Sequence, residues 1–319
     1  MTRRVLITGA SGFVGHALTR HLVAHKAGEV IAMTRTATYH RVPGVQYVPV
    51  GDLTASMHWT PALAGIDTVV HAAARVHVLN DDAANLTVEF ERVNVFVTLE
   101  LARQAVAAGV RRFVFLSSIG VNGVQTDNTT PFTEADQPRP HNAYAQSKLK
   151  AEEALRQFAV QTGLELVIIR PPLVYGPGVR ANFAALMRAV QRGWPLPLAC
   201  VHNLRSMVAM DNLVSFVATC IDHPQAVNTT LLVSDGQDVS SPDLVRGLAR
   251  AFGVPVRLVP VPVSVLQAVG RALGKGDAIQ RVCGSLRVDI SKARRLLAWE
   301  PQVSMEEGLR RAVAGMDRP

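Results

Sequence analysis

The chain has 319 residues, of which 48% are hydrophobic, 18% charged and 5% aromatic. This is the balance of an ordinary globular protein, and the length allows one large core or two unequal ones. The formal net charge is +8, but no basic run alternates with aromatic residues, so the composition argues against nucleic-acid binding. The excess of positive charge suits small anionic ligands equally well.

The cysteines and the apolar stretches bear on where the protein works. Cys200, Cys220 and Cys283 are far apart and show no metal-ligand spacing, which predicts reduced thiols, no bound metal and a cytoplasmic protein. The apolar run before Gly9 is too short for a secretion signal, and we expect no membrane span. The most apolar segment, residues 254–273, contains arginines and prolines, and it predicts a strand followed by a buried or surface helix.

Short apolar runs alternate with helical patterns over the first half of the chain. Strands are expected at residues 4–8, 29–35, 45–50, 67–74, 111–118 and 164–170. Helices are expected at residues 12–25, 85–108 and 141–158. The strands lack internal alternation, which is typical of a parallel sheet covered by helices on both faces. The fold class is therefore α/β, a doubly wound parallel sheet that binds ligands outside the carboxyl ends of its strands.

The texture changes after "RPPLVYGPG", residues 170–178, where prolines become frequent and the elements shorter. Further helices are expected near residues 181–192, 211–222, 241–252 and 305–314. We therefore divide the chain into a first domain, residues 1–170, and a smaller lobe, residues 171–319, which is interleaved with returns to the sheet.

Three glycines stand between the first predicted strand and the first predicted helix, in the stretch "TGASGFVG". Glycine permits a tight turn and close backbone approach to a pyrophosphate, while the helix N-terminus offers N–H groups and a positive dipole end. Spaced glycines alone are weak evidence, but their position between a strand and a helix strengthens it. A simple tight turn is the alternative.

The spacing of Gly9, Gly12 and Gly15 resembles the "TGxxGFxG" of the extended branch of the short-chain dehydrogenase/reductase superfamily. The resemblance runs along nearly the whole chain. It implies a dinucleotide-binding Rossmann domain over residues 1–170 and a substrate-binding lobe over residues 171–319. The cofactor contacts that it implies in this turn are Gly9, Ser11, Gly12, Phe13, Val14 and Gly15.

The end of the second strand bears on the choice of cofactor. Thr34 and Arg35 stand where NAD-preferring relatives commonly have an acidic residue, and an arginine can pair with a 2′-phosphate. We therefore expect NADP, with NAD as the alternative. In "GDL", Asp52 and Leu53 resemble the adenine contact of the family, in which the aspartate accepts from the exocyclic amine.

Other cofactor contacts follow from the resemblance alone. The stretch "HAAA" resembles the loop that passes the cofactor ribose, with His71 as a packing residue. Asn94 matches an asparagine that this branch uses near the active site. The cofactor contacts implied in these segments and after the sixth strand are Ala72, Ala73, Ala74, Asn94 and Pro171.

The stretch "HNAYAQSKLKAEEALRQF", residues 141–158, carries the candidate chemistry. Tyr144 and Lys148 lie four apart on a helix face that continues as an apolar stripe. An inward lysine is costly unless a neighbouring group needs its charge. In "FLSSIGVNG", which matches the family's "SSxxVYG", Ser118 takes the position of the catalytic serine.

Ser118, Tyr144 and Lys148 together imply proton transfer beside a nicotinamide. The phenol of a tyrosine titrates near about 10, and an adjacent ammonium lowers its pKa by roughly 1–3 units. Tyr144 would move a proton at the substrate oxygen while hydride crosses to or from the nicotinamide. Ser118 would hold that oxygen, and Lys148 would also bind the cofactor ribose.

Two departures from the family narrow the reaction. Dehydratases have an acidic pair after the catalytic residue, where this chain has Ile119 and Gly120, so dehydration is rejected. Epimerases usually have a tyrosine where Asn122 stands, which weakens epimerisation without excluding it.

The substrate-side residues follow from the same comparison. "RSMVAMDNLV" resembles a segment whose arginine approaches a sugar-nucleotide diphosphate, so Arg205 is the leading candidate, with a structural salt bridge to Asp211 as the alternative. The full set of expected substrate contacts is Arg75, Ser118, Asn122, Arg205 and Arg281.

The sequence looks most like bacterial reductases of UDP-4-keto-6-deoxy sugars of the quinovosamine type. An NADP(H)-dependent 4-ketoreductase is therefore the leading hypothesis, and a UDP-sugar 4-epimerase with tightly bound NAD is the alternative. A hydroxysteroid or dihydroflavonol-type dehydrogenase is the third. A non-catalytic NADP sensor fits poorly because Ser118, Tyr144 and Lys148 are all present. The family also implies a homodimer.

Overall fold

The computed structural model describes residues 3–36, 41–52, 58–75, 83–127 and 129–316. Its main feature is a seven-stranded sheet in the order β3-β2-β1-β4-β5-β6-β9, in which every pair of neighbours is parallel. The strands are β1 (Arg4–Thr8), β2 (Glu29–Thr34), β3 (Gln46–Pro49), β4 (Thr68–His71), β5 (Arg112–Leu116), β6 (Glu165–Arg170) and β9 (Thr229–Leu232). The α/β, Rossmann-type class is confirmed.

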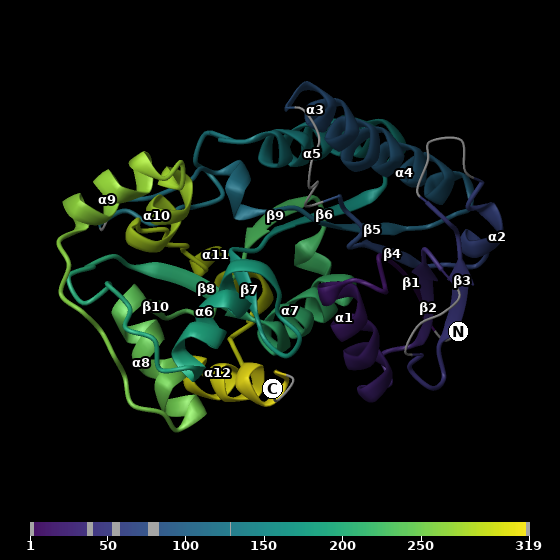
Figure 1. Cartoon of the computed structure of the whole chain (residues 1–319). Helices are drawn as coiled ribbons and strands as arrows, with labels where there is room; N and C mark the ends of the chain where they lie inside the picture. Colours follow the sequence, from purple (N-terminus) through teal and green to yellow (C-terminus); the bar gives the residue numbers. More distant parts are fainter. Residues whose placement is uncertain (1–2, 37–40, 53–57, 76–82, 128, 317–319) are drawn as a thin grey trace.

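Helices cover both faces of this sheet (Figure 1). One layer is formed by α1 (Phe13–Ala24) and α7 (Met210–Asp222). The other is formed by α2 (Thr60–Leu63), α3 (Ala83–Glu91), a π-helical turn (Arg92–Phe96), α4 (Val97–Ala107) and α5 (Ala143–Thr162). Along β1, Val5 and Ile7 pack into the first layer and Leu6 into the second. Both faces are buried, which explains why the strands show no alternation.

A second, three-stranded sheet has the order β10-β8-β7 and comes wholly from residues beyond 170. Its strands are β7 (Leu173–Tyr175), β8 (Arg205–Ala209) and β10 (Asp238–Val239). The other helices of this part are α6 (Ala181–Gln191), α8 (Ser241–Phe252), α9 (Val263–Ala272), α10 (Gly276–Cys283) and α12 (Met305–Ala314), while α11 (Ser291–Leu297) packs against β9. β9 is a strand of the large sheet and α7 covers one face of that sheet. The chain after residue 170 therefore contributes to both parts of the molecule.

Helix α5 begins two residues later than the sequence pattern suggests. Asn142 is extended, with φ −145°, and its side-chain oxygen accepts from the backbone N–H of Ala145 at 2.8 Å. This N-cap fixes the first turn at Ala143. The helix ends at Gly163, whose φ of 75° is the left-handed conformation of a helix terminus. Tyr144 therefore lies in the first turn of α5.

Candidate active site

The glycine turn after β1 packs against the loop after β4. Gly9 has a φ of +65°, and a Cβ on it would lie 2.7 Å from the backbone nitrogen of Ala73. A Cβ on Gly15 would lie 2.2 Å from the carbonyl oxygen of Gly9. Both positions therefore require glycine. Gly12 is the N-cap of α1 and has no side-chain cap, so the first N–H groups of this helix face the turn.

Ser118 stands directly after β5 and begins a 3₁₀ turn, Ile119–Val121. Its hydroxyl oxygen accepts from the backbone N–H of Gly120 at 3.1 Å. A Cβ on Gly120 would lie 3.4 Å from the Ser118 hydroxyl oxygen and 3.9 Å from Cε1 of His141. The end of β5 and the segment leading into α5 therefore lie together, with Ser118 and His141 on either side of a glycine.

Lys148 is 2% exposed and lies against the end of β5. Its ammonium donates to the carbonyl oxygen of Leu116 at 2.7 Å and lies 4.4 Å from the centre of the Phe115 ring. Burial lowers the pKa of Lys148 to about 7, and the carboxylate of Glu152 opposes this shift. The lysine is thus held against the end of β5, one helical turn after Tyr144.

Tyr144 differs from the sequence expectation in its electrostatics. Burial raises the pKa of its phenol to about 12, whereas an adjacent ammonium was expected to lower it. The reason is desolvation of the phenolate, since the Lys148 ammonium is bonded to Leu116 instead. The Tyr144 ring packs edge-on against Phe90, with ring centres 6.1 Å apart.

A buried ionic network, which the sequence analysis missed, supports this arrangement. Glu152 is 0% exposed and accepts from Arg170 through Nε at 2.9 Å and Nη2 at 2.5 Å. It also accepts from the hydroxyl of Ser117 at 2.5 Å. The network joins α5 to the carboxyl ends of β5 and β6. The available signal was spacing, because Glu152 follows Lys148 by one turn on the inward face of the helix.

Asn122, which is expected to bind substrate, belongs to the same network. Its amide oxygen accepts from Arg170 Nη1 at 2.9 Å, and its amide nitrogen donates to the Thr133 carbonyl oxygen at 2.8 Å. The residue is 1% exposed. Both ends of the amide are engaged, so Asn122 anchors the loop that follows Ser118.

Asn94 is likewise a support and does not face a ligand. It is 1% exposed, accepts from the Arg75 backbone N–H at 2.9 Å and donates to Ser147 at 3.0 Å. His71 bonds to the hydroxyls of Thr8 at 2.7 Å and Thr98 at 2.9 Å. Burial lowers the pKa of His71 to about 3, so it is neutral. Both residues fix the loop after β4.

Two of the residues expected at the adenosine end of the cofactor, Arg35 and Asp52, are largely exposed. Arg35 follows β2 with 74% of its side chain exposed, and its guanidinium lies 3.8 Å from the carboxylate of Asp52, which is 86% exposed. An exposed pair at this distance contributes little. Thr34 is buried, and its hydroxyl donates to the Thr36 carbonyl oxygen at 3.0 Å. Leu53 lies outside the described residues.

Arg205 lies at the start of β8 and donates to the carbonyl oxygen of Gly284 at 2.9 Å. Burial and the charge of Arg281 lower its pKa, and the carbonyl that it contacts belongs to the C-cap of α10, the helix that carries Arg281. The alternative salt bridge from Arg205 to Asp211 is wrong, because the carboxylate of Asp211 pairs with Arg311 at 3.2 Å. The structure thus brings Arg205 and Arg281 together.

The remaining substrate candidate, Arg75, is held on the other side of the site. Its guanidinium pairs with Glu89 at 3.0 Å. Pro171 lies after β6, and its carbonyl oxygen accepts from the backbone N–H of Ile119 at 3.0 Å. That bond fixes the turn that begins at Ser118.

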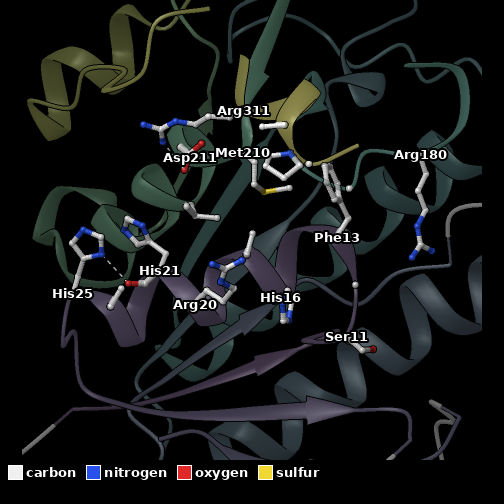
Figure 2. A pocket seen from close by; sticks show the side chains of 18 residues that line it. Ser11, Phe13, His16, Arg20, His21, His25, Arg180, Met210, Asp211 and Arg311 are labelled. Atoms are coloured by element: carbon white, nitrogen blue, oxygen red, sulfur yellow. Dashed lines mark hydrogen bonds and ion pairs between the residues drawn. The ribbon is translucent and has the colours of Figure 1, made fainter. Parts of the chain in front are cut away.

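A separate cavity of about 840 Å³ lies between α1 and the elements α7 and α12. Figure 2 shows that Ser11 and Phe13 line one end of it, and that His21 and His25 stand farther along α1. It touches the glycine turn but contains neither Ser118 nor Tyr144. The candidate chemistry therefore lies outside this cavity, at the carboxyl ends of β5 and β6.

Comparison with known proteins agrees with this site. The model of the NAD dependent epimerase/dehydratase family matches residues 5–233. A UDP-glucose 4-epimerase of Vibrio cholerae is 42% identical over 311 residues, which cover 97% of this chain and 94% of that protein. GDP-6-deoxy-D-mannose reductase of Pseudomonas aeruginosa is 27% identical over 322 residues, which cover 97% of this chain and 96% of that protein.

A solved structure gives the same result in three dimensions. MoeE5 in complex with UDP-glucose and NAD matches with a TM-score of 0.77 at 27% identity, and the match covers 98% of each chain. The family model spans more than half of the sequence, and the Vibrio relative spans almost all of it. The chain is therefore an NAD(P)-dependent enzyme of the NAD dependent epimerase/dehydratase family, in the extended branch of the short-chain dehydrogenases/reductases.

Proposed function

We propose that the protein is a UDP-sugar 4-epimerase. The observation that carries this proposal is the 42% identity to a UDP-glucose 4-epimerase over 97% of the chain. The sequence alone favoured a 4-ketoreductase through its resemblance to bacterial reductases, and Asn122 in place of a tyrosine weakened epimerisation. That objection is weakened, since Asn122 is buried and bonded to Arg170 and Thr133. No carboxylate stands at Ile119 or Gly120, so dehydration stays unsupported.

The glycine turn fits the pyrophosphate of the cofactor. The uncapped N–H groups at the start of α1 suit an anion, and Gly9 leaves no room for a side chain beside Ala73. The contacts proposed for the cofactor in this turn are Gly9, Ser11, Gly12, Phe13, Val14 and Gly15. These residues would hold NAD, which would supply reversible hydride transfer at the sugar.

The residues of the chain handle the accompanying proton. The phenol oxygen of Tyr144 takes the proton of the sugar 4-hydroxyl and later returns it, while the Ser118 hydroxyl donates a hydrogen bond to the same sugar oxygen. When protonated, Lys148 on the next turn of α5 would favour the phenolate and oppose the burial that raises the pKa of Tyr144. The nearby carboxylate of Glu152 favours the charged form of this lysine. Arg205 and Arg281 are proposed to hold the diphosphate of the substrate.

One observation favours the 4-ketoreductase as a second candidate. Arg35 is largely exposed at the end of β2, where a 2′-phosphate of NADP would lie, and its pairing to Asp52 is long. A reductase that exchanges NADPH needs such a contact, whereas an epimerase that retains NAD does not. The 27% identical reductase of Pseudomonas aeruginosa supports the same candidate more weakly.

The two candidates separate in one experiment. Purified enzyme is incubated with UDP-glucose, with no nucleotide added and with NAD added, and UDP-galactose is followed by chromatography. In parallel, a UDP-4-keto-6-deoxy sugar and NADPH are followed at the nicotinamide absorbance. Epimerisation without NADPH consumption supports the proposal. Stoichiometric NADPH oxidation with no epimerisation would overturn the epimerase proposal in favour of the ketoreductase.

A further inference from the structure

Exposed apolar side chains concentrate at one edge of the lobe. On α9, Val265, Val269 and Leu273 are 48%, 51% and 65% exposed. They follow one another at intervals of four residues, so they form a single stripe along the helix. Val256, Val259 and Val282 are also exposed in the same part of the chain. A contiguous exposed apolar patch is unusual on a globular protein and marks an interaction surface.

This stripe is not needed to hold the helix in place. Leu266 and Gly270 form the buried side of α9, and a Cβ on Gly270 would lie 2.5 Å from Cγ1 of Ile279 on α10. Helix α10 has no buried residue of its own. In Figure 1 the α9–α10 hairpin stands at the edge of the molecule, away from the large sheet. The apolar surface of α9 therefore extends beyond the side of the helix that is buried.

Basic residues flank the stripe. Residues 254–284 contain Arg257, Arg271, Lys275 and Arg281, against the single acid Asp277. Within the described part of the chain, no ion pair involves Arg257, Arg271 or Lys275. Unpaired cations beside an exposed apolar stripe are the pattern of a helix that lies in the plane of a membrane surface.

A neighbouring loop extends the surface with an aromatic residue. Trp194 is 55% exposed, and the guanidinium of Arg192 lies 5.6 Å from the centre of its ring. The loop is joined to the segment before α9, since Leu196 donates to the Arg257 carbonyl oxygen and Val259 donates to the Leu196 carbonyl oxygen, both at 2.8 Å. Tryptophan with flanking basic residues is enriched at lipid headgroup depth.

We propose that the α9–α10 hairpin, residues 263–283, together with Trp194, docks the enzyme on an anionic membrane surface. The stripe of α9 enters the headgroup region, and the flanking cations meet the lipid phosphates. In the described part of the chain, no helix combines the length and apolar character needed to cross a membrane, so the contact is peripheral. The proposal rests on this surface and is independent of the sugar-nucleotide reaction.

A second copy of the chain is the competing occupant, and charge argues against it. In a two-fold interface the same patch faces itself, so the lysine and arginines around α9 would oppose their own copies. Lipid phosphates offer the complementary sign. The hairpin also carries Arg281 near Arg205, so docking would put a membrane beside the proposed substrate site.

The test is sedimentation of the full-length protein with vesicles. Equal parts of phosphatidylglycerol and phosphatidylcholine are compared with phosphatidylcholine alone, at low and high salt. Wild type should bind the anionic vesicles at least about tenfold better than the neutral ones, and added salt should weaken that binding. The double variant Val269→Glu with Leu273→Glu should lose at least about tenfold, because two carboxylates replace the inserted side chains.

Matched controls keep the outcome clear. Val160 is 87% exposed on α5, so Val160→Glu should bind vesicles like wild type. Arg271→Ser with Lys275→Ser should lose binding to anionic vesicles alone. The proposal is overturned if wild type and the α9 double variant bind vesicles equally. It is also overturned if wild type does not bind anionic vesicles. A dimer that becomes monomeric in the double variant assigns the patch to a subunit interface and also overturns it.

Discussion

The carboxylate of Glu152 and the guanidinium of Arg170 form a buried ion pair with two hydrogen bonds, at 2.9 and 2.5 Å. Glu152 comes from α5 one turn after Lys148, and Arg170 ends β6. The pair therefore fixes the helix that carries Tyr144 to the sheet edge that carries Ser118. Its cost of desolvation is met by a third bond from Ser117 and a further one from Arg156.

Removing one partner of this pair should destabilise the protein strongly. Glu152→Gln leaves the buried charge of Arg170 uncompensated, at an expected cost of about 3–5 kcal/mol in the free energy of unfolding. Denaturant titration measures the loss. The control is Glu300→Gln, which breaks the exposed pair with Arg294 and should cost less than about 1 kcal/mol. Equal losses in the two variants would mean that the buried pair contributes no more than a surface contact.

Tyr144→Phe should bind cofactor and substrate but turn over slowly. The variant keeps the ring against Phe90 and loses only the hydroxyl that is proposed to move the proton. We expect kcat to fall by about 10²–10⁴ while the Kd for NAD changes little. The control is Tyr47→Phe on β3, which loses a hydroxyl that accepts from the backbone N–H of Val42. Near-normal turnover in Tyr144→Phe would remove this tyrosine from the proton-transfer step.

The buried lysine should give a pH-dependent stability. Its pKa falls from 10.5 to about 7 on folding. Between these pH values the unfolded chain keeps the proton and the folded protein does not, so the free energy of unfolding should rise with pH by at most about 1.4 kcal/mol per unit. Lys148→Met should lack this slope in denaturant titrations at pH about 7 and about 9. Parallel slopes would show that the folded protein keeps Lys148 charged.

Gly9 and Gly163 both have a positive φ, but they should respond differently to substitution by alanine. Gly9→Ala meets both a positive φ and the backbone of Ala73 at 2.7 Å, so it should lose stability and NAD binding. Gly163→Ala has a φ of +75° and nothing within 4 Å, so only the strain of about 1–2 kcal/mol applies. Calorimetry gives the melting temperatures, and titration gives NAD affinity. Intact NAD binding in Gly9→Ala would contradict the proposed pyrophosphate site.

Local patterns in the sequence were enough to predict the first six strands, the glycine turn and the shared face of Tyr144 and Lys148, but not the four strands after residue 170. Contacts between distant segments were not predictable in the same way. The bond from Arg170 to Asn122 forms only because β5 and β6 are neighbours, and this order is a property of the folded sheet. The predicted direction of the pKa shift of Tyr144 was wrong for a related reason, because desolvation depends on everything packed around the ring. The NADP preference stays a prediction.

The strand order has a practical consequence for dividing the chain. β9 pairs with β6 along four residues, and the buried guanidinium of Arg112 donates to the carbonyl oxygens of Cys220 and Ile221 at the end of α7. A fragment that stops at residue 170 would leave the edge of β6 that faces β9 unpaired and Arg112 without these acceptors. An apolar open edge of that kind recruits other chains. We therefore expect such fragments to precipitate. During synthesis, the large sheet should be completed only after residue 232 has left the ribosome.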